Sequence, residues 1–198
     1  MRSPLARLPR PWRTVADWVL TLALAVGFVL VFEAEIAKPY RIPSSSMEPT
    51  LHCARPTIGC QARFSDRVLA ARIVYRFRSP ERGDIVVFTT PPRTTQICHT
   101  ERSATFVKRL IGLPGDTVSE RNGYVYINGR RLDEPYVSPQ DRDRRTQTWP
   151  RLGPGRYFMM GDDRSLSCDS RDWGPVPRGN LIGPVVATYW PPTRLSVR

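Results

Sequence analysis

Residues 105–132 read TFVKRLIGLPGDTVSERNGYVYINGRRL, and this stretch decides the fold. Its first part is an apolar run that ends in a Pro-Gly turn at Pro114-Gly115, as expected of a buried strand. Two Asn-Gly pairs, Asn122-Gly123 and Asn128-Gly129, then flank the segment YVYI. Asn-Gly is the strongest short hairpin signal because both turn residues need positive φ. The stretch therefore predicts a strand followed by a three-stranded antiparallel meander.

Outward from this stretch the chain continues in strands and turns. Apolar segments bounded by Gly or Pro predict further strands at 66–77, 83–88, 156–162 and 182–190. Residues 138–155 are polar and rich in Gly and Pro, and they predict a loop. The chain has 198 residues, of which 40% are hydrophobic and 20 are prolines. These numbers predict one mainly β domain with antiparallel sheets, without long helices, and with a short extra segment.

The extra segment is the apolar run 15–32, VADWVLTLALAVGFVLVF. Four arginines and no acidic residue precede it: Arg2, Arg7, Arg10 and Arg13. A membrane span needs about 20 apolar residues, and positive flanks stay in the cytoplasm. The predicted organisation has three parts: a cytoplasmic segment 1–14, a transmembrane signal-anchor helix 15–36 and an extracytoplasmic domain 37–198. A cleaved signal peptide is the first alternative, but the following EAEIAKPY lacks a small-x-small cleavage site. A buried core helix is the second.

Just after this run, residues 42–51 read IPSSSMEPTL. Serine-rich stretches bounded by proline are usually linkers, and a serine becomes a nucleophile only beside a base. Lys108 is the candidate base, because it is one of only two lysines in a chain that otherwise uses arginine. Arginine cannot lose its proton near neutral pH, whereas a buried lysine can. Apolar neighbours such as Phe106 and Leu110 predict a lowered pKa for Lys108. The alternative is a lysine whose amine reaches solvent from the polar face of a strand.

Four motifs occur in order after the apolar run: PSSSMEPTL, RGDIVVF, VKRLIGLPGD and GDDRSLSCDSRDWGPVP. Together they resemble the bacterial type I signal peptidases, membrane proteases with a Ser-Lys dyad that remove signal peptides from exported preproteins. The resemblance implies an antiparallel β catalytic domain on the extracytoplasmic side of the cell membrane, without a metal or another cofactor. It also implies preprotein signal peptides, membrane lipids and the export machinery as partners, and no nucleic acid.

The resemblance assigns roles to individual residues. The nucleophile is Ser46, the general base is Lys108, the Ser44 hydroxyl and Ser46 N–H form the oxyanion hole, Ser167 hydrogen-bonds the lysine amine, and Asp169 and Arg171 form a supporting ion pair. In an extended segment, alternation puts Ser44 and Ser46 on one side and leaves Ser45 as a spacer.

The chain departs from the family pattern at two positions in its last motif. Asp163 stands where asparagine is usual, and Leu166 replaces a frequent asparagine. Neither position carries the chemistry, so the departures affect only local hydrogen bonding.

Two other classes of protein share part of this pattern. The soluble Ser-Lys autoproteases of the SOS repressor type begin with a DNA-binding module, and the apolar run 15–32 argues against them. The net charge of +12 suggests a membrane-tethered β-barrel that binds nucleic acid or a lipid surface. Scattered basic residues and ungrouped aromatic residues argue against nucleic acid, and the excess charge suits anionic lipid headgroups better.

The four cysteines form an even set, and an extracytoplasmic location permits disulfides. Four cysteines allow three connectivities. We predict Cys53–Cys60, which closes a short loop, and Cys98–Cys168, which would clamp the last motif near the lysine strand. Reduced cysteines are an alternative. Zinc is another, although the C-x6-C spacing is not a usual ligand pattern.

Overall fold

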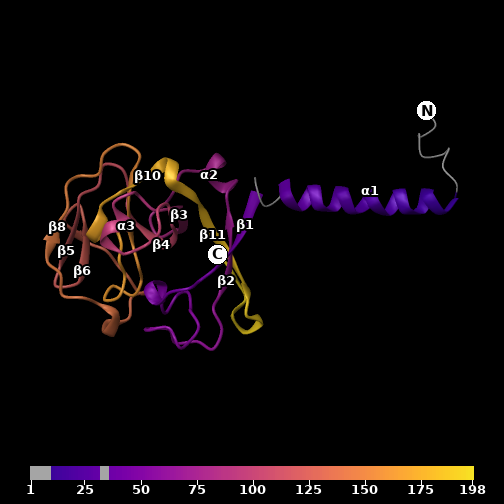
Figure 1. Ribbon diagram of the computed structural model, residues 1–198. Coiled ribbons are helices and arrows are strands. Elements are labelled where there is room, and N and C mark those ends of the chain that lie inside the picture. The colour runs from indigo at the N-terminus through magenta and orange to yellow at the C-terminus, as the bar shows by residue number, and fades with distance from the viewer. Residues whose placement is uncertain (1–9, 32–35) are drawn as a thin grey trace.

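The computed structural model describes residues 10–31 and 36–198, and it is mainly antiparallel β, as predicted (Figure 1). The strands are β1 (Ala37–Arg41), β2 (Arg67–Ala71), β3 (Ile85–Thr89), β4 (Thr105–Gly112), β5 (Val118–Arg121), β6 (Tyr124–Ile127), β7 (Arg130–Arg131), β8 (Gln147–Thr148), β9 (Arg156–Met160), β10 (Val176–Pro177), β11 (Leu181–Trp190) and β12 (Ser196–Val197). The α-helices are α1 (Arg10–Val31), α2 (Val74–Phe77), α3 (Thr94–Ile97) and α4 (Ser170–Trp173). The described residues also form the 3₁₀ helices η3 (Ser45–Met47), η4 (Pro139–Asp141), η5 (Arg178–Asn180) and η6 (Pro192–Arg194).

The strands form two sheets. The larger sheet has the order β1-β2-β11-β3-β4-β9-β10, with β12 paired to β11, and the smaller has the order β7-β6-β5-β8. The long strand β11 lies between β2 and β3, so it connects the first two strands to the rest of the larger sheet. Figure 1 shows the smaller sheet on the side of the domain away from α1.

The predicted meander is confirmed as β5, β6 and β7. Asn122 and Asn128 have φ values of 48° and 51°, and the glycines that follow them have 77° and 82°. A Cβ at Gly123 would lie 2.2 Å from the Asp143 carbonyl oxygen, so this turn also needs glycine for space. The hairpins therefore form where the sequence predicts them.

The other predicted strands are confirmed with changed bounds. Segments 83–88, 156–162 and 182–190 correspond to β3, β9 and β11 within a few residues, whereas the predicted strand 66–77 is strand only in β2 and is followed by the one-turn helix α2. The predicted loop 138–155 includes η4 and the two-residue strand β8, which pairs with β5. Short elements of this kind form through their partners rather than through a pattern of their own.

Three apolar clusters hold the domain together and place the serine segment. Met47, which is 1% exposed, and Leu51 pack in the first cluster with residues of β2, β3 and β11. The second cluster lies around β3, β4 and β9, and the third joins β4 and β9 to the smaller sheet. Burying a methionine side chain stabilises by about 1.5–3 kcal/mol. Met47 therefore anchors the serines that precede it.

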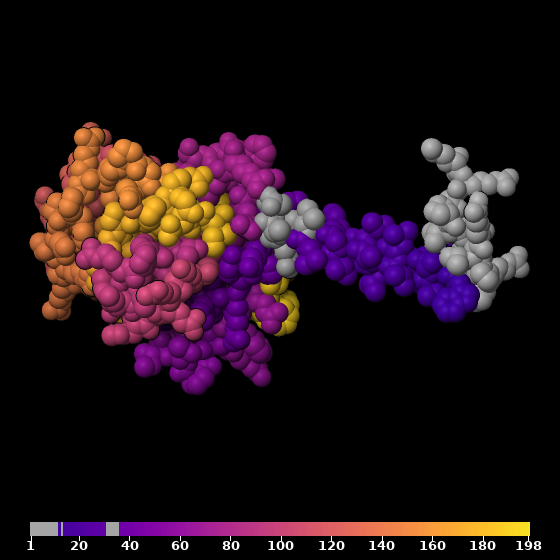
Figure 2. Space-filling view, turned by 45° about the horizontal axis from the view of Figure 1, so that its top comes forward, coloured from indigo at the N-terminus to yellow at the C-terminus, as the bar shows by residue number. Residues whose placement is uncertain are grey.

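Helix α1 projects from the domain beside β1, and its apolar side chains are largely exposed (Figures 1 and 2). Within the described residues, no helix combines the length and the apolarity that a membrane crossing requires. The transmembrane helix predicted for residues 15–36 is therefore not found in the structure, and residues 32–35 lie outside the described part of the chain.

Candidate active site

The serine segment is a turn rather than a strand. Ser44 is extended, with φ −130° and ψ 158°, but Ser45–Met47 form a 3₁₀ turn closed by a bond from Glu48 N to Ser45 O of 2.8 Å. The predicted extended segment is thus wrong from Ser45 onwards, because burial of Met47 turns the chain inward. Residues two apart in a strand lie about 6.6 Å apart along its axis. The turn brings the Ser44 and Ser46 hydroxyl oxygens to 3.3 Å from each other.

Ser45 lies apart from its two neighbours. Its side chain is buried, and a Cβ at Gly59 would come within 2.6 Å of its hydroxyl oxygen. Ser45 therefore packs against the loop between Cys53 and Cys60, where only a glycine leaves it room. Its packing agrees with the spacer role predicted for it.

Lys108 lies in the middle of β4, directly opposite Val86 of β3. It is 3% exposed, and its amine nitrogen lies 5.6 Å from the centroid of the Phe106 ring. Burial lowers the pKa of Lys108 to about 8; the Asp169 carboxylate opposes this change and the Arg171 guanidinium reinforces it. The predicted lowering of the Lys108 pKa is therefore confirmed. The alternative, in which the amine reaches solvent from the polar face of a strand, is not.

Ser44, Ser46 and Lys108 line one cavity of about 360 Å³. Its walls come from residues 40–47, from residues 98–108 and from Leu166 and Cys168. Among the described residues, the Ser46 hydroxyl bonds only to Ser44 and not to the Lys108 amine. Catalytic hydrogen bonds are often long in an enzyme without substrate and tighten only in the complex.

The last motif lies directly behind the serine turn. Asp163 N donates to the Ser46 carbonyl at 3.3 Å, and a Cβ at Gly161 would lie 2.3 Å from both the Ser46 carbonyl oxygen and the Ser167 hydroxyl. The Ser167 hydroxyl is buried against Gly161 and has no hydrogen-bond partner in the described part of the chain. The hydrogen bond predicted between Ser167 and the lysine amine is therefore not formed in this structure.

Of the two departures from the family pattern, Asp163 has a local effect only, whereas Leu166 lies at the cavity. Asp163 Oδ1 accepts hydrogen bonds from the Ser165 hydroxyl at 2.8 Å and from Leu166 N at 3.0 Å. An asparagine oxygen could accept the same bonds, so the substitution keeps the turn. Leu166 is half exposed and forms part of the cavity wall.

Asp169 and Arg171 form the predicted ion pair. Arg171 Nε and Nη2 donate to the two carboxylate oxygens of Asp169 at 2.8 and 2.9 Å, and Arg171 N donates to the same carboxylate at the start of α4. Burial opposes ionisation of Asp169, but Arg171 outweighs it and keeps the pKa of Asp169 below its usual value. The negative charge of Asp169 also acts on Lys108 and opposes the lowering of its pKa, which the sequence did not indicate.

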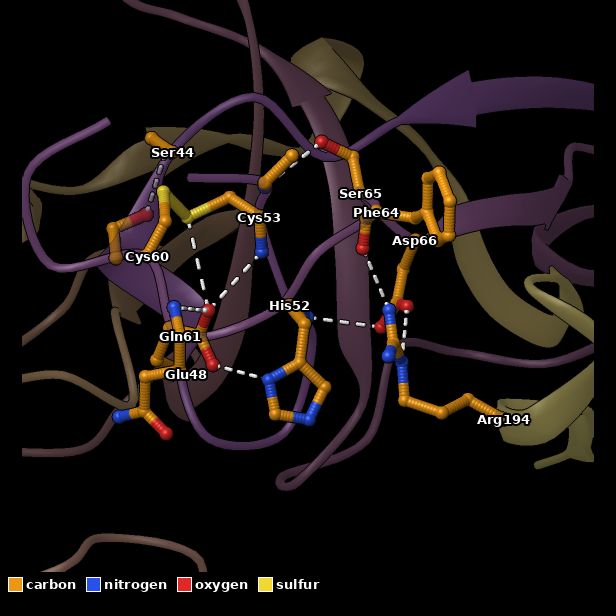
Figure 3. Close-up of a disulfide and its surroundings, with 12 residues drawn as sticks. Ser44, Glu48, His52, Cys53, Cys60, Gln61, Phe64, Ser65, Asp66 and Arg194 are labelled. Atoms are coloured by element: carbon orange, nitrogen blue, oxygen red, sulfur yellow. Dashed lines mark hydrogen bonds and ion pairs between the residues drawn. A yellow bond between two sulfur atoms is a disulfide. The ribbon is translucent and has the colours of Figure 1, made fainter. Parts of the chain in front are cut away.

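Glu48 is a buried charge that sequence reasoning missed (Figure 3). It is 1% exposed, and its Oε1 accepts hydrogen bonds from Cys53 N at 3.1 Å and Gln61 N at 3.3 Å, while Oε2 contacts His52 Nδ1. Its carboxylate thus ties the residue after the 3₁₀ turn to both ends of the Cys53–Cys60 loop. No sequence pattern around Glu48 predicts this role, because its hydrogen-bond partners come from an irregular loop.

Both predicted disulfides are confirmed. Cys53–Cys60 joins residues seven apart, and Cys98–Cys168 joins residues 70 apart. Both cysteines of the second bond line the cavity, so this disulfide fixes the last motif to the segment before β4. In residues 10–31 and 36–198, no group of three His, Cys, Asp or Glu is arranged to hold a metal ion.

The comparisons with known proteins agree with this geometry. The family described as signal peptidase, peptidase S26 matches residues 15–190. A signal peptidase I of Leptolyngbya laminosa is 38% identical over 98% of this chain and 89% of that protein. A signal peptidase I of Mycobacterium tuberculosis is 33% identical over 96% of this chain and 78% of that protein.

A crystal structure of a signal peptidase I from Enterococcus faecalis V583 is 32% identical and covers 55% of this chain and 97% of that one, with a TM-score of 0.45. The two relatives and the family match span almost the entire sequence, including the serine turn, the lysine strand and the last motif. This chain therefore belongs to the signal peptidase family, peptidase S26.

Proposed function

We propose that this chain removes N-terminal signal peptides from exported preproteins as a serine endopeptidase, with Ser46 as nucleophile and Lys108 as general base. The position of Lys108 carries the proposal: its amine is buried in the wall of the cavity that also holds Ser46. A free lysine titrates near 10.4 and is almost wholly protonated at neutral pH. With a pKa of about 8, an appreciable fraction is neutral and able to accept a proton.

In the proposed reaction, neutral Lys108 takes the proton of the Ser46 hydroxyl, and Ser46 attacks the scissile carbonyl. The Ser44 hydroxyl and the Ser46 N–H stabilise the oxyanion. The lysine ammonium then protonates the leaving amine, which releases the mature protein. Water hydrolyses the acyl-enzyme with Lys108 again as base. Ser167 lies behind the serine turn, and the pair of Asp169 and Arg171 holds the last motif in place.

The cavity offers an open strand edge to an extended substrate. Residues 105–108 of β4 pair with β3 on one side, but β9 pairs with β4 only from Arg109 onwards. No strand of the described residues pairs with the other edge of 105–108, and this edge lies at the cavity. A peptide can add there through main-chain hydrogen bonds. Small side chains at positions −1 and −3, which the family resemblance implies, suit a cavity of this size.

Membrane attachment is the second part of the proposal. We assign residues 15–36 as a signal-anchor with the N-terminus in the cytoplasm and the catalytic domain outside, where preproteins arrive from the export machinery. The apolar run 15–32 and the four arginines before it support this assignment. Phe64, Trp190 and Leu195 are also exposed on the domain, and the rings of Phe64 and Trp190 lie 6.5 Å apart. Aromatic side chains of this kind favour the lipid headgroup region.

Cleavage of a preprotein by the purified full chain in detergent tests the enzymatic part. Ser46→Ala should abolish cleavage, and Ser45→Ala, the matched control one residue away, should retain most of it. Mass spectrometry of the released mature protein locates the cut. An active Ser46→Ala enzyme together with an inactive Ser45→Ala enzyme would refute the assignment of the nucleophile.

Protease added to intact spheroplasts tests the topology separately. The catalytic domain should be digested, and the chain should stay with the membrane on alkaline extraction. Protection of the domain, or its release from the membrane by alkali, would contradict the proposed attachment while leaving the chemistry of the cavity untouched.

A further inference from the structure

Glu120 is a buried carboxyl group that the proposed reaction does not use. It lies on β5, opposite Val125 of β6 and Gln147 of β8, and is 1% exposed. Neither of its carboxylate oxygens receives a hydrogen bond from any residue that the structure describes. A buried carboxylate without donors is strongly destabilised, since it has lost its hydration and gained nothing in return.

The nearest cation to Glu120 is already occupied. Arg171 Nη1 lies 3.7 Å from Glu120 Oε1, beyond hydrogen-bond distance. The same guanidinium donates to both oxygens of Asp169 and, at 2.7 Å, to Asp143 Oδ2. Arg171 therefore faces three carboxyl groups, one of which, Asp143, also lies 3.4 Å from Arg145 Nε. Arg164, the other cation that acts on Glu120, is itself in contact with Glu134.

A proton on Glu120 resolves this imbalance. Burial raises the pKa of Glu120 to about 7; Arg171 opposes the rise, and Asp143 reinforces it by its charge and as a hydrogen-bond partner. The acid form of a carboxyl supplies its own O–H donor, and the Asp143 carboxylate is the acceptor beside it. A proton on Glu120 thus explains both the lack of hydrogen-bond donors around its oxygens and the number of carboxyl groups around Arg171.

We propose that Glu120 is a positioning residue whose carboxyl group keeps its proton and donates a hydrogen bond to Asp143. This leaves Arg171 to organise the loop 161–169 behind Lys108. Arg171 Nη2 donates to the Arg164 carbonyl at 2.9 Å, within this loop. The charge of Arg171 also favours neutral Lys108. Loss of the Glu120 proton would add a negative charge next to Arg171 and so favour the ammonium form of Lys108, which is inactive as a base. This last link rests on the proposed function.

Unfolding of the full chain in detergent as a function of pH tests the proton on Glu120. Folded Glu120 holds a proton that the unfolded chain has lost between the ordinary pKa of 4.5 and about 7. Wild-type stability should therefore fall across this window with a slope of about one proton per molecule. Glu120→Gln, which mimics the acid form, should remove this slope and raise the unfolding midpoint at alkaline pH. The matched control Glu81→Gln alters an exposed carboxyl group and should keep the wild-type slope.

Two further measurements complete the test. Infrared difference spectra should show a protonated carboxyl at neutral pH in the wild type that is absent from Glu120→Gln. The rise of kcat/KM with pH should move to lower pH in Glu120→Gln, which loss of packing alone would not produce. Neither unfolding nor infrared spectra require a substrate, so they report on Glu120 even if the chain cleaves no preprotein. Destabilisation of Glu120→Gln at every pH, or an unchanged carboxyl band, would overturn the proposal.

Discussion

The two halves of the candidate site are built in opposite ways. The serine half is an irregular turn, and the buried Glu48 beneath it receives hydrogen bonds from two backbone N–H groups and contacts His52. The lysine half is a regular strand, and the buried Glu120 behind it receives none. Both glutamates are 1% exposed. The two glutamates are therefore equally buried, but the carboxylate of Glu48 accepts hydrogen bonds and that of Glu120 does not.

This difference teaches what each half needs. The serine turn has no ladder of strand hydrogen bonds, so a fully bonded carboxylate and a disulfide loop fix its geometry. The lysine strand is already fixed by β3, and by β9 from Arg109 onwards, so burial, together with the charges of Asp169 and Arg171, acts on the protonation of Lys108 instead. In the serine half, a buried charge fixes the position of the turn. In the lysine half, buried charges act on the protonation of Lys108.

The largest expected effect comes from Lys108→Met, which breaks the lysine half. Cleavage should fall by a factor of at least about 10²–10⁴, the usual contribution of a general base. The variant should nevertheless be more stable at neutral pH. Lowering the lysine pKa from 10.5 to about 8 corresponds to a penalty of about 3 kcal/mol in the free energy of unfolding. Methionine removes this penalty, and denaturant unfolding with a parallel cleavage assay measures both changes.

The effect of Lys108 on stability and on cleavage also depends on pH in a stated direction. The folded state holds fewer protons on Lys108 than the unfolded state between about pH 8 and 10.5, so wild-type stability rises with pH in this window. The advantage of Lys108→Met should shrink over the same window. Wild-type kcat/KM should rise with pH through about 8, and Lys108→Arg should be inactive throughout. An active Lys108→Arg enzyme would show that Lys108 acts only as a cation.

A smaller effect is expected from Ser44→Ala, which leaves the serine turn in place. Removing one oxyanion donor reduces kcat by about 10²–10³, with little change in KM. Ser45→Ala, whose hydroxyl packs against Gly59, is the matched control and should retain most activity. Steady-state kinetics on a preprotein distinguish them, and equal losses in the two variants would contradict the oxyanion role of Ser44.

The smallest effect, on stability, compares the two glutamates directly. Glu48→Ala leaves the buried N–H of Cys53 and the more exposed N–H of Gln61 without an acceptor and should destabilise by about 1–3 kcal/mol. Glu48→Gln should also destabilise, although less, because an amide oxygen can accept part of these bonds. Glu120→Gln should stabilise at alkaline pH. Thermal unfolding of the three variants at one alkaline pH measures the contrast, which is lost if Glu48→Gln and Glu120→Gln change stability in the same direction.

Local sequence signals predicted much of the fold. Asn-Gly pairs define β5 to β7, and apolar runs define β3, β9 and β11. Lys108 was identifiable because arginine serves almost everywhere else as the cation. Each of these signals lies within a few residues of the feature that it predicts.

The remaining features depend on contacts between distant segments. The 3₁₀ turn at Ser45–Met47 follows from Met47 entering a cluster that also contains Val185, and the strand β1 contains Pro39 and forms through β2. The environment of Glu120 is set by Arg171, which no spacing in the sequence connects to it. Such features could not be read from local patterns, because their cause lies elsewhere in the chain.

The place of β11 also sets the order of events when the chain is made. Within the larger sheet, β1 and β2 beside the serine turn meet β3 and β4 only through β11, which is synthesised long after them. Pairing between segments far apart in sequence must overcome loop-closure entropy and is slow. A growing chain that has already made Ser46 and Lys108 therefore has two unjoined parts. We expect the enzyme to mature late, when β11 inserts between them.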